Sequence, residues 1–246
     1  MNNKIKTNYP WLYDLPELVD DFLESLKKTD SKYAFFPAKK GLTKHGLKLE
    51  LGFSCYALKL KYITDKYNNL STNQKDSWIK FINSFQTSNS NYIENSYIDH
   101  EYINAIYEFN IFSSSKYIVK KLLTNSKIKQ YETLDDFVTR SLRAETKQAI
   151  VTIKEAGYKP KFIYRDLIDD ENFMIDYLEK QNWSFPWMAG AQFANMSLFL
   201  SQLENEKINK HTKDIINFID EVCDPQTGAY FINPKPSNRE LINGSM

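Results

Sequence analysis

The stretch "FIDEVCDPQTGAYF" at residues 218–231 ends a helix-like run in a Pro-Gly turn and then returns to aromatic residues. Three other segments share its plan: an apolar pair, another apolar or amphipathic residue three positions on, a polar turn and an aromatic return. They are "FLESLKKTDSKYAFF" from Phe22, "FINSFQTSNSNYI" from Phe81 and "YLEKQNWSFPW" from Tyr177. Their apolar pairs begin 59, 96 and 41 residues apart, and a period of about 40 to 60 residues is the length of a helical hairpin with its loops. The pattern therefore predicts a series of helical hairpins.

Helical periodicity dominates the chain outside these turns, and no convincing alternating strand pattern occurs. Ser71 or Thr72 precedes one apolar-periodic run, as a helix cap should. Thr133 precedes two first-turn acids, and Gly157 follows another run. The sequence therefore predicts an all-α fold. Helices are expected at residues 15–28, 44–66, 73–86, 97–111, 113–124, 133–156, 168–181, 188–204 and 209–223, with one more starting near residue 238.

The predicted helices are of two kinds. The run at residues 73–85 has one apolar stripe and a charged back, whereas the runs at 46–60 and 188–203 are apolar or small on nearly all sides. A helix of the second kind is typically buried on both flanks. Alternation of the two kinds suggests an outer and an inner layer, so we expect an α/α toroid of about five helical hairpins. An open helical-repeat solenoid is the alternative.

The toroid is expected to form a single domain over residues 1–246, since a chain of this length can bury a substantial core. Its last residues, "SNRELINGSM" at 237–246, look like the opening of another inner helix that stops within about two turns. We therefore expect the ring to be incomplete.

Composition narrows the class of protein. Apolar residues make up 42% of the 246 residues and aromatic residues 15%, which excludes a disordered chain. The formal net charge is +1 with acids and bases interspersed, so no nucleic-acid partner is expected. No stretch approaches the ~20 apolar residues that cross a bilayer, and residues 1–15 lack a signal-peptide core. We expect a cytoplasmic protein without a membrane span.

Motifs for cofactors and metals are missing from the sequence. It contains no P-loop, G-x-G-x-x-G, nucleophile elbow or H-E-x-x-H pattern. Its two cysteines, Cys55 and Cys223, are isolated thiols, too few for a thiolate metal site. Neither a cofactor nor a metal is therefore expected.

Two stretches resemble a known architecture. "DPQTGAYF" at residues 224–231 resembles the loop between outer and inner helices of α/α-toroid proteins, and "NWSFPWMAGAQFANMSLFL" at 182–200 resembles the entry into an inner helix of their carbohydrate-active members. This superfamily includes squalene cyclases and prenyltransferases as well as polysaccharide lyases, glycosidases and uronyl epimerases. The resemblance implies a central funnel, lined by the N-termini of inner helices, that binds a carbohydrate or small-molecule substrate. The Asp-rich box of squalene cyclases and the zinc ligands of prenyltransferases are not evident, which disfavours the terpenoid branch.

Three residues are the predicted acid and base groups. Glu50 lies in an apolar run, where burial raises the pKa of a carboxyl group, although a structural ion pair with a nearby basic residue is the alternative. His100 lies near the start of a predicted helix, and histidine suits proton transfer near neutral pH, although a solvated surface position is the alternative. Tyr56 is the third candidate.

Aromatic and amide side chains are predicted to bind substrate. Trp183, Phe185 and Trp187 precede an inner helix, where exposed rings would stack on sugar faces; alternatively, they cap the core. Gln192 and Asn195 lie in the apolar run that follows. Because an unpaired buried amide costs roughly 1–3 kcal/mol, these two would bond either ligand hydroxyls or neighbouring helix carbonyls.

Three further polar residues complete the predicted site. His45 lies near the start of a predicted inner helix, at the end expected to face the funnel, although a solvated surface position is again the alternative. Arg143 and Glu145 flank opposite edges of an apolar stripe. An arginine there would clamp a carboxylate or phosphate bidentately, or the pair would bond to neighbouring helices instead.

These features together predict a carbohydrate-processing protein that acts on a glycan or a uronic-acid-containing sugar by acid/base chemistry in a central funnel. A polysaccharide lyase, a glycoside hydrolase or an epimerase would fit. Two alternatives stay open: a non-catalytic helical scaffold that binds a partner, and a terpenoid-cyclase-like or prenyltransferase-like enzyme.

Overall fold

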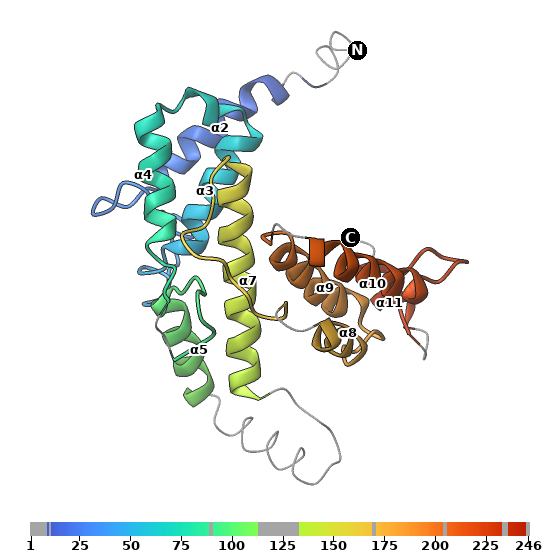
Figure 1. The fold of residues 1–246 in the computed structure, drawn as a ribbon. Helices are drawn as coiled ribbons and strands as arrows, with labels where there is room; N and C mark the ends of the chain where they lie inside the picture. Colours follow the sequence, from blue (N-terminus) through green and yellow to red (C-terminus); the bar gives the residue numbers. More distant parts are fainter. Residues whose placement is uncertain are drawn as a thin grey trace. The chain divides into compact units, whose positions relative to one another are not determined.

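The computed structural model describes residues 9, 11–88, 91–112, 133–168, 171–203, 206–232 and 236–244. Over these residues the chain is mostly helical and contains no regular strand, which confirms the all-α class (Figure 1). It divides into two compact units that are described separately below. Unit 1 comprises Met1–Thr87 and Ser96–Lys161, and unit 2 comprises Ser88–Asn95 and Phe162–Met246. The toroid, the solenoid and the single domain stay predictions.

Unit 1 is built around one central helix. Its described elements are α2 (Trp11–Leu26), α3 (Leu51–Ile63), the 3-10 helix η1 (Lys66–Asn69), α4 (Thr72–Asn83), α5 (His100–Phe112) and α7 (Leu134–Glu155). Helix α3 contacts α2, η1, α4 and α7. Helices α3 and α7 lie side by side (Figure 1).

The core of unit 1 lies where α3, α4 and α7 meet. Leu51 and Cys55 of α3 are fully buried, and Trp78 of α4 donates from its Nε1 to the Ser54 hydroxyl over 2.9 Å. The predicted apolar stripe of α7 is confirmed, because every member is at most 1% exposed: Leu142, Thr146, Ala149, Ile150 and Ile153. Helix α3 is less enclosed than its sequence predicts, since the Tyr56 side chain is exposed.

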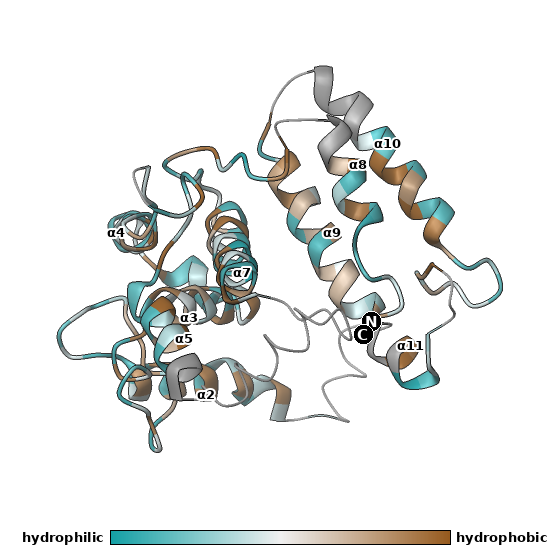
Figure 2. Ribbon diagram, turned by 90° about the horizontal axis from the view of Figure 1, so that it is seen from below, coloured by the Kyte–Doolittle hydropathy of each residue, from teal (hydrophilic) through white to brown (hydrophobic). Residues whose placement is uncertain are grey.

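Unit 2 contains α8 (Glu171–Glu179), α9 (Pro186–Leu200), α10 (Glu206–Val222) and α11 (Asn238–Gly244). Helix α9 contacts the other three. Helix α10 alternates between hydrophobic and hydrophilic colours along its length, as a one-sided helix should (Figure 2). The core of the unit includes Trp183, whose ring lies 5.8 Å from that of Phe218, and Phe199, whose ring lies 4.5 Å from that of Tyr164.

Three of the four repeated turns close in the same way. Each forms an isolated antiparallel bridge: Lys27 with Phe35, Gln86 with Tyr97, and Cys223 with Tyr230. Two backbone hydrogen bonds flank the second bridge. Thr87 N–H donates to the Ser96 carbonyl over 3.1 Å, and Ile98 N–H donates to the Phe85 carbonyl over 2.9 Å. Equivalent bonds close the other two loops, so the sequence repeat is a structural repeat in which the chain returns beside the end of a helix.

The predicted helix boundaries hold for most elements. Ser71 and Thr133 each form a capping box at the start of a helix, and Gly157 ends α7 with a positive φ of 85°. The largest difference is the predicted helix at 44–66, which begins only at Leu51, because residues 44–48 form turns. The predicted helix at 113–124 lies outside the described residues. None of the helices described here is both long and apolar enough to cross a membrane.

Replacing Phe35 with alanine should destabilise unit 1 strongly. The Phe35 side chain is 3% exposed and stacks on Trp78 with ring centroids 5.7 Å apart, so its removal leaves a cavity. We expect the free energy of unfolding to fall by about 3–5 kcal/mol, measured by urea denaturation.

Tyr230→Ala is the matched control for that variant. Tyr230 occupies the same position in the third bridge but is 44% exposed. We expect it to lose less than about 1 kcal/mol. Equal losses in the two variants would mean that burial of the returning aromatic does not set its contribution.

Candidate functional site

The start of α3 is capped by a carboxylate from another part of unit 1. Asp99 directly precedes α5 and is 5% exposed. Its Oδ2 accepts the backbone N–H groups of Glu50 at 2.8 Å and Leu51 at 3.1 Å, and its Oδ1 accepts the N–H of Glu101 at 3.1 Å. A carboxylate is favoured at a helix N-terminus by the unpaired N–H groups and the helix dipole. Asp99 therefore fixes the starts of α3 and α5 to each other.

A second carboxyl group, that of Glu145 on α7, faces the same helix start. A Cβ atom placed on Gly52 would lie 3.6 Å from both Glu145 oxygens, so the carboxyl group lies directly over the first turn of α3. Burial, with the negative charge of Asp99 as a second cause, raises the pKa of Glu145 to about 7. A carboxyl group with such a pKa holds and releases a proton near neutral pH.

Glu50 forms an ion pair instead of standing alone. Its carboxylate lies 3.9 Å from the Lys28 ammonium, whose side chain is buried. Burial raises the pKa of Glu50, and the charge of Lys28 opposes this rise. The ion-pair alternative for Glu50 is thus supported, with a partner that the sequence did not indicate. Lys48 and Lys61 pair elsewhere, with Glu101 and Asp20 respectively.

His45 is held between two carboxylates. Its Nδ1 lies 3.0 Å from Glu101 and its Nε2 lies 2.6 Å from Glu108, both on α5. The hydrogen bonds with Glu108 and then Glu101 raise the pKa of His45, and the same bonds lower the pKa of each carboxyl group. The His45 contacts therefore tie the turns before α3 to the side of α5.

These contacts form one connected group, which we call the Asp99 cluster: Lys28, His45, Glu50, Asp99, Glu101, Glu108 and Glu145. Three of the predicted site residues, His45, Glu50 and Glu145, come together in it. Asp99, Lys28 and the two α5 glutamates were missed by the sequence reasoning. The fragment "YIDHEYI" carries two of them beside His100, but only its histidine drew a prediction.

Three further predicted residues lie on the helices that carry the cluster, on α5, α3 and α7 respectively. His100 is the first residue of α5 and is exposed. Tyr56 is 55% exposed and lies one turn beyond Gly52 on the same face of α3. Arg143 is half-buried and lies two positions before Glu145, so the two side chains leave α7 in different directions.

Unit 2 divides the predicted aromatic residues between core and surface. Trp183 is 2% exposed and its Nε1 donates to the Leu178 carbonyl over 2.8 Å, which fits the alternative that it caps the core. Trp187 is 55% exposed and Phe185 is 46% exposed at the start of α9. These two rings are the ones available for stacking.

The two predicted amides of α9 are both buried. The Oε1 of Gln192 accepts the Tyr177 hydroxyl at 2.9 Å and the Asn195 amide at 3.5 Å. The Oδ1 of Asn195 is buried without a hydrogen-bond partner in the part of the chain that is described. Gln192 therefore bonds to other side chains of the protein, which neither alternative named, and Asn195 keeps an unsatisfied acceptor among the described residues.

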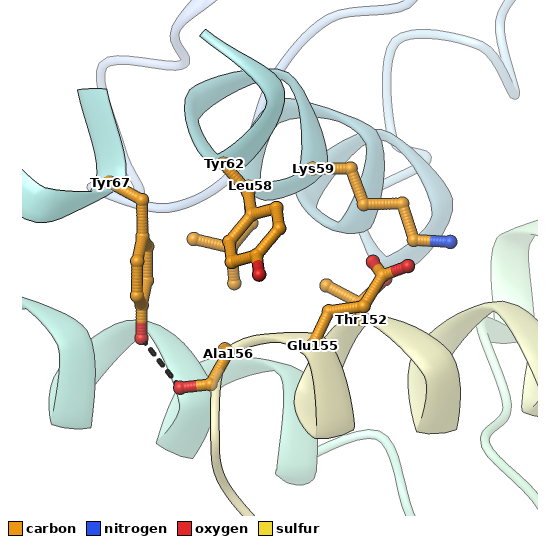
Figure 3. Close-up of a pocket in the computed structure, with 7 residues that line it drawn as sticks. All are labelled: Leu58, Lys59, Tyr62, Tyr67, Thr152, Glu155 and Ala156. Atoms are coloured by element: carbon orange, nitrogen blue, oxygen red, sulfur yellow. Dashed lines mark hydrogen bonds between the residues drawn. The ribbon is translucent and has the colours of Figure 1, made fainter. Parts of the chain in front are cut away.

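A hollow in unit 1 lies away from the Asp99 cluster (Figure 3). It is formed by the later turns of α3 and α7 and by η1, and it contains at most about 160 Å³ of empty space, part of which is open to solvent. Tyr67 donates to the Ala156 carbonyl over 2.9 Å across one side of it. Ligand pockets usually measure about 300–1,000 Å³, so this hollow is small for a sugar chain. Within the described ranges, no group of three His, Cys, Asp or Glu side chains is arranged to hold a metal ion.

Glu145→Gln should remove a pH dependence of stability. The raised pKa means that the folded chain keeps a proton that the unfolded chain releases. Protonation of Glu145 therefore makes its full contribution to stability below about pH 4.5, and this contribution is lost as the pH rises through about 7. At pH 8 the variant should be more stable than the wild type by about 3 kcal/mol, with little difference at pH 4. Urea denaturation across this range measures it.

Glu155→Gln is the control, since Glu155 is an exposed residue at the end of the same helix. It should keep the wild-type pH dependence. A Glu145→Gln variant with an unchanged dependence would mean that Glu145 is ionised in the folded protein at neutral pH.

His45 should titrate above its usual range. A histidine with a raised pKa favours folding fully below about pH 6.5, and this contribution disappears as pH rises through its folded-state pKa. Following the His45 ring protons by NMR should give a midpoint above about 6.5, which falls in Glu108→Gln. A midpoint that Glu108→Gln leaves unchanged would contradict the double contact.

Comparison with known proteins gives no relative of this chain: no family model matches it, and neither a curated protein nor a solved structure shows significant similarity.

Proposed function

We propose that this chain is a carbohydrate-processing protein of the α/α-toroid type and that Glu145 is its acid/base group. One observation carries the proposal: a half-buried carboxyl group with a pKa of about 7 faces a helix start that a second carboxylate, Asp99, already occupies. This differs from the sequence expectation, in which Glu145 binds substrate and Glu50, Tyr56 and His100 transfer protons.

Glu145 suits proton transfer in either direction. At a pKa of about 7 the protonated and ionised forms are comparably populated at neutral pH, which is the condition for efficient general acid/base catalysis. As an acid it would give its proton to a glycosidic oxygen while the carbon–oxygen bond breaks. As a base it would take the proton from the carbon beside a sugar carboxylate, as lyase or epimerase chemistry requires.

The neighbouring residues support this role by position. Asp99 is a positioning residue, since its oxygens hold three backbone N–H groups and thereby fix the helix start that Glu145 faces. Tyr56 is exposed one turn beyond Gly52 on the same face of α3, where its hydroxyl would serve as a second proton donor. Glu50 is already neutralised by Lys28, which makes it the weaker candidate.

A separate sugar-binding surface is proposed on unit 2, formed by two exposed rings of that unit. Trp187 and Phe185 present flat apolar faces at the start of α9. Such rings stack on sugars with little loss of conformational entropy, because each has two side-chain torsions. Trp183 is excluded from this role, since it is buried and bonded to the backbone.

A non-catalytic helical scaffold is the second candidate function. The hollow at the ends of α3 and α7 favours it, because at most about 160 Å³ of empty space, open solvent included, is too little to enclose a sugar chain. A scaffold needs only exposed helix faces, and unit 1 has them.

Turnover of uronic-acid polysaccharides tests the proposal. The wild type, incubated with pectate, alginate and heparin-type glycans, should release unsaturated or reducing ends. Its kcat/KM should change with a midpoint near pH 7, falling above it if Glu145 acts as an acid and below it if Glu145 acts as a base. Glu145→Gln should lower kcat by about 10²-fold or more.

Glu155→Gln, an exposed change on the same helix, should keep full activity. Turnover by Glu145→Gln at the wild-type rate would remove Glu145 from the reaction. Failure of the wild type both to turn over and to bind any of these glycans would favour the scaffold.

A further inference from the structure

Helix α2 carries an apolar stripe that unit 1 leaves exposed. Trp11, Leu15, Leu18 and Phe22 follow one another at intervals of four, three and four residues, which puts them on one face of the helix. Their side chains are 57%, 38%, 60% and 48% exposed. Single exposed apolar residues are ordinary, but a continuous exposed stripe usually marks an interaction site.

The stripe is a second apolar face, distinct from the one that anchors α2. Leu23 and Leu26 are buried and form the anchoring face. Asp20 pairs with Lys61 of α3, and Glu17 pairs with Lys66 of η1. Both ion pairs hold α2 against the rest of unit 1. The stripe lies apart from these two leucines and from both ion pairs, so a partner that covers it would not displace them.

The charge beside the stripe is negative. Helix α2 contains five acidic residues and no basic one. Asp14 lies one helical turn from both Trp11 and Leu18, and Asp21 lies one turn beyond Leu18, so the two aspartates border the same side of the stripe. Both aspartates are exposed. At the far end, the Lys39 ammonium lies 5.5 Å from the Phe22 ring. The acidic edge therefore flanks the first three residues of the stripe.

This charge argues against two of the possible occupants. A membrane-surface helix carries lysine and arginine on its polar face, where they meet anionic lipids, and α2 has neither. In a symmetric pair of antiparallel α2 helices, equivalent edges meet across the two-fold axis. Asp14 and Asp21 of one copy would then face the same residues of the other, and like charges at that spacing repel.

We propose that α2 is the docking site for an amphipathic helix of a partner protein that carries lysine or arginine along one edge. The apolar side of the partner would cover the stripe from Trp11 to Phe22, in the helix-on-helix mode used by many recognition helices. Its basic edge would pair with Asp14 and Asp21. Because such rim pairs mainly set orientation and selectivity, the stripe supplies the affinity and the acidic edge supplies the choice of partner.

The test uses two fluorescein-labelled peptides and the full chain. One is a helical peptide with leucines spaced like the stripe and lysines along one edge; the other has glutamate in place of each lysine. Fluorescence anisotropy should show that the wild type binds the lysine peptide at least about ten-fold more tightly than the glutamate peptide. Leu18→Glu should weaken this binding by about ten-fold or more. The double variant Asp14→Lys, Asp21→Lys should reverse the preference.

Ile63→Glu is the matched control, because Ile63 is 76% exposed at the end of α3 and lies outside the stripe. It should bind the lysine peptide like the wild type, and circular dichroism should show all variants folded. Equal affinity of the wild type for the two peptides would overturn the proposal, as would equal losses in Leu18→Glu and Ile63→Glu. A dimer in size-exclusion chromatography that Leu18→Glu dissociates without peptide would also overturn it, by assigning the stripe to a second copy of the chain.

Discussion

Two backbone hydrogen bonds at the turn between α4 and α5 fix the position on which the site of unit 1 depends. The bonds from Thr87 to Ser96 and from Ile98 to Phe85 bring the chain back beside the end of α4. The next residue along the chain is Asp99, and it emerges where the first N–H groups of α3 are unpaired. A loop of variable length can therefore deliver a side chain to a fixed place, because the closure of the loop and not its length sets the exit.

The half-buried carboxyl group of Glu145 is the costly part of this arrangement. A Cβ atom on Gly52 would lie in ordinary van der Waals contact with both Glu145 oxygens, so a side chain larger than alanine at this position would crowd them. Burial, with the negative charge of Asp99 as a second cause, raises the pKa of Glu145, and this makes the fold less stable at neutral pH than at acidic pH. Burial also raises the pKa of Glu50, but the opposite charge of Lys28 works against this rise. Among the five acids of the cluster, Glu50 is thus paired with a lysine, whereas Glu145 is partly protonated at neutral pH.

The sequence allowed the helices and the repeated turns to be predicted, because both depend on local patterns. The capping residues Ser71 and Thr133 and the stop at Gly157 act over a few neighbouring residues. The pairs of residues that form the Asp99 cluster could not be predicted in the same way. Lys28 and Glu50 lie 22 positions apart, and His45 and Glu108 lie 63 positions apart. Only the tertiary structure of unit 1 decides which of several available lysines and glutamates become partners.

The two tryptophans before α9 show that local sequence also does not tell which side chain is exposed. Trp183 and Trp187 are four positions apart in one short stretch, and their composition and spacing make them equal candidates for a sugar surface. The structure buries the first and exposes the second. The Trp183 ring lies 5.8 Å from that of Phe218, and its indole N–H donates to the Leu178 carbonyl, which also accepts the N–H of Gln181. The last carbonyls of a helix lack intrahelical partners, so the end of α8 offers an acceptor to the indole that lies beside it. What an aromatic residue contributes to a surface therefore depends on where the preceding helix ends, and the spacing of the two tryptophans does not reveal this.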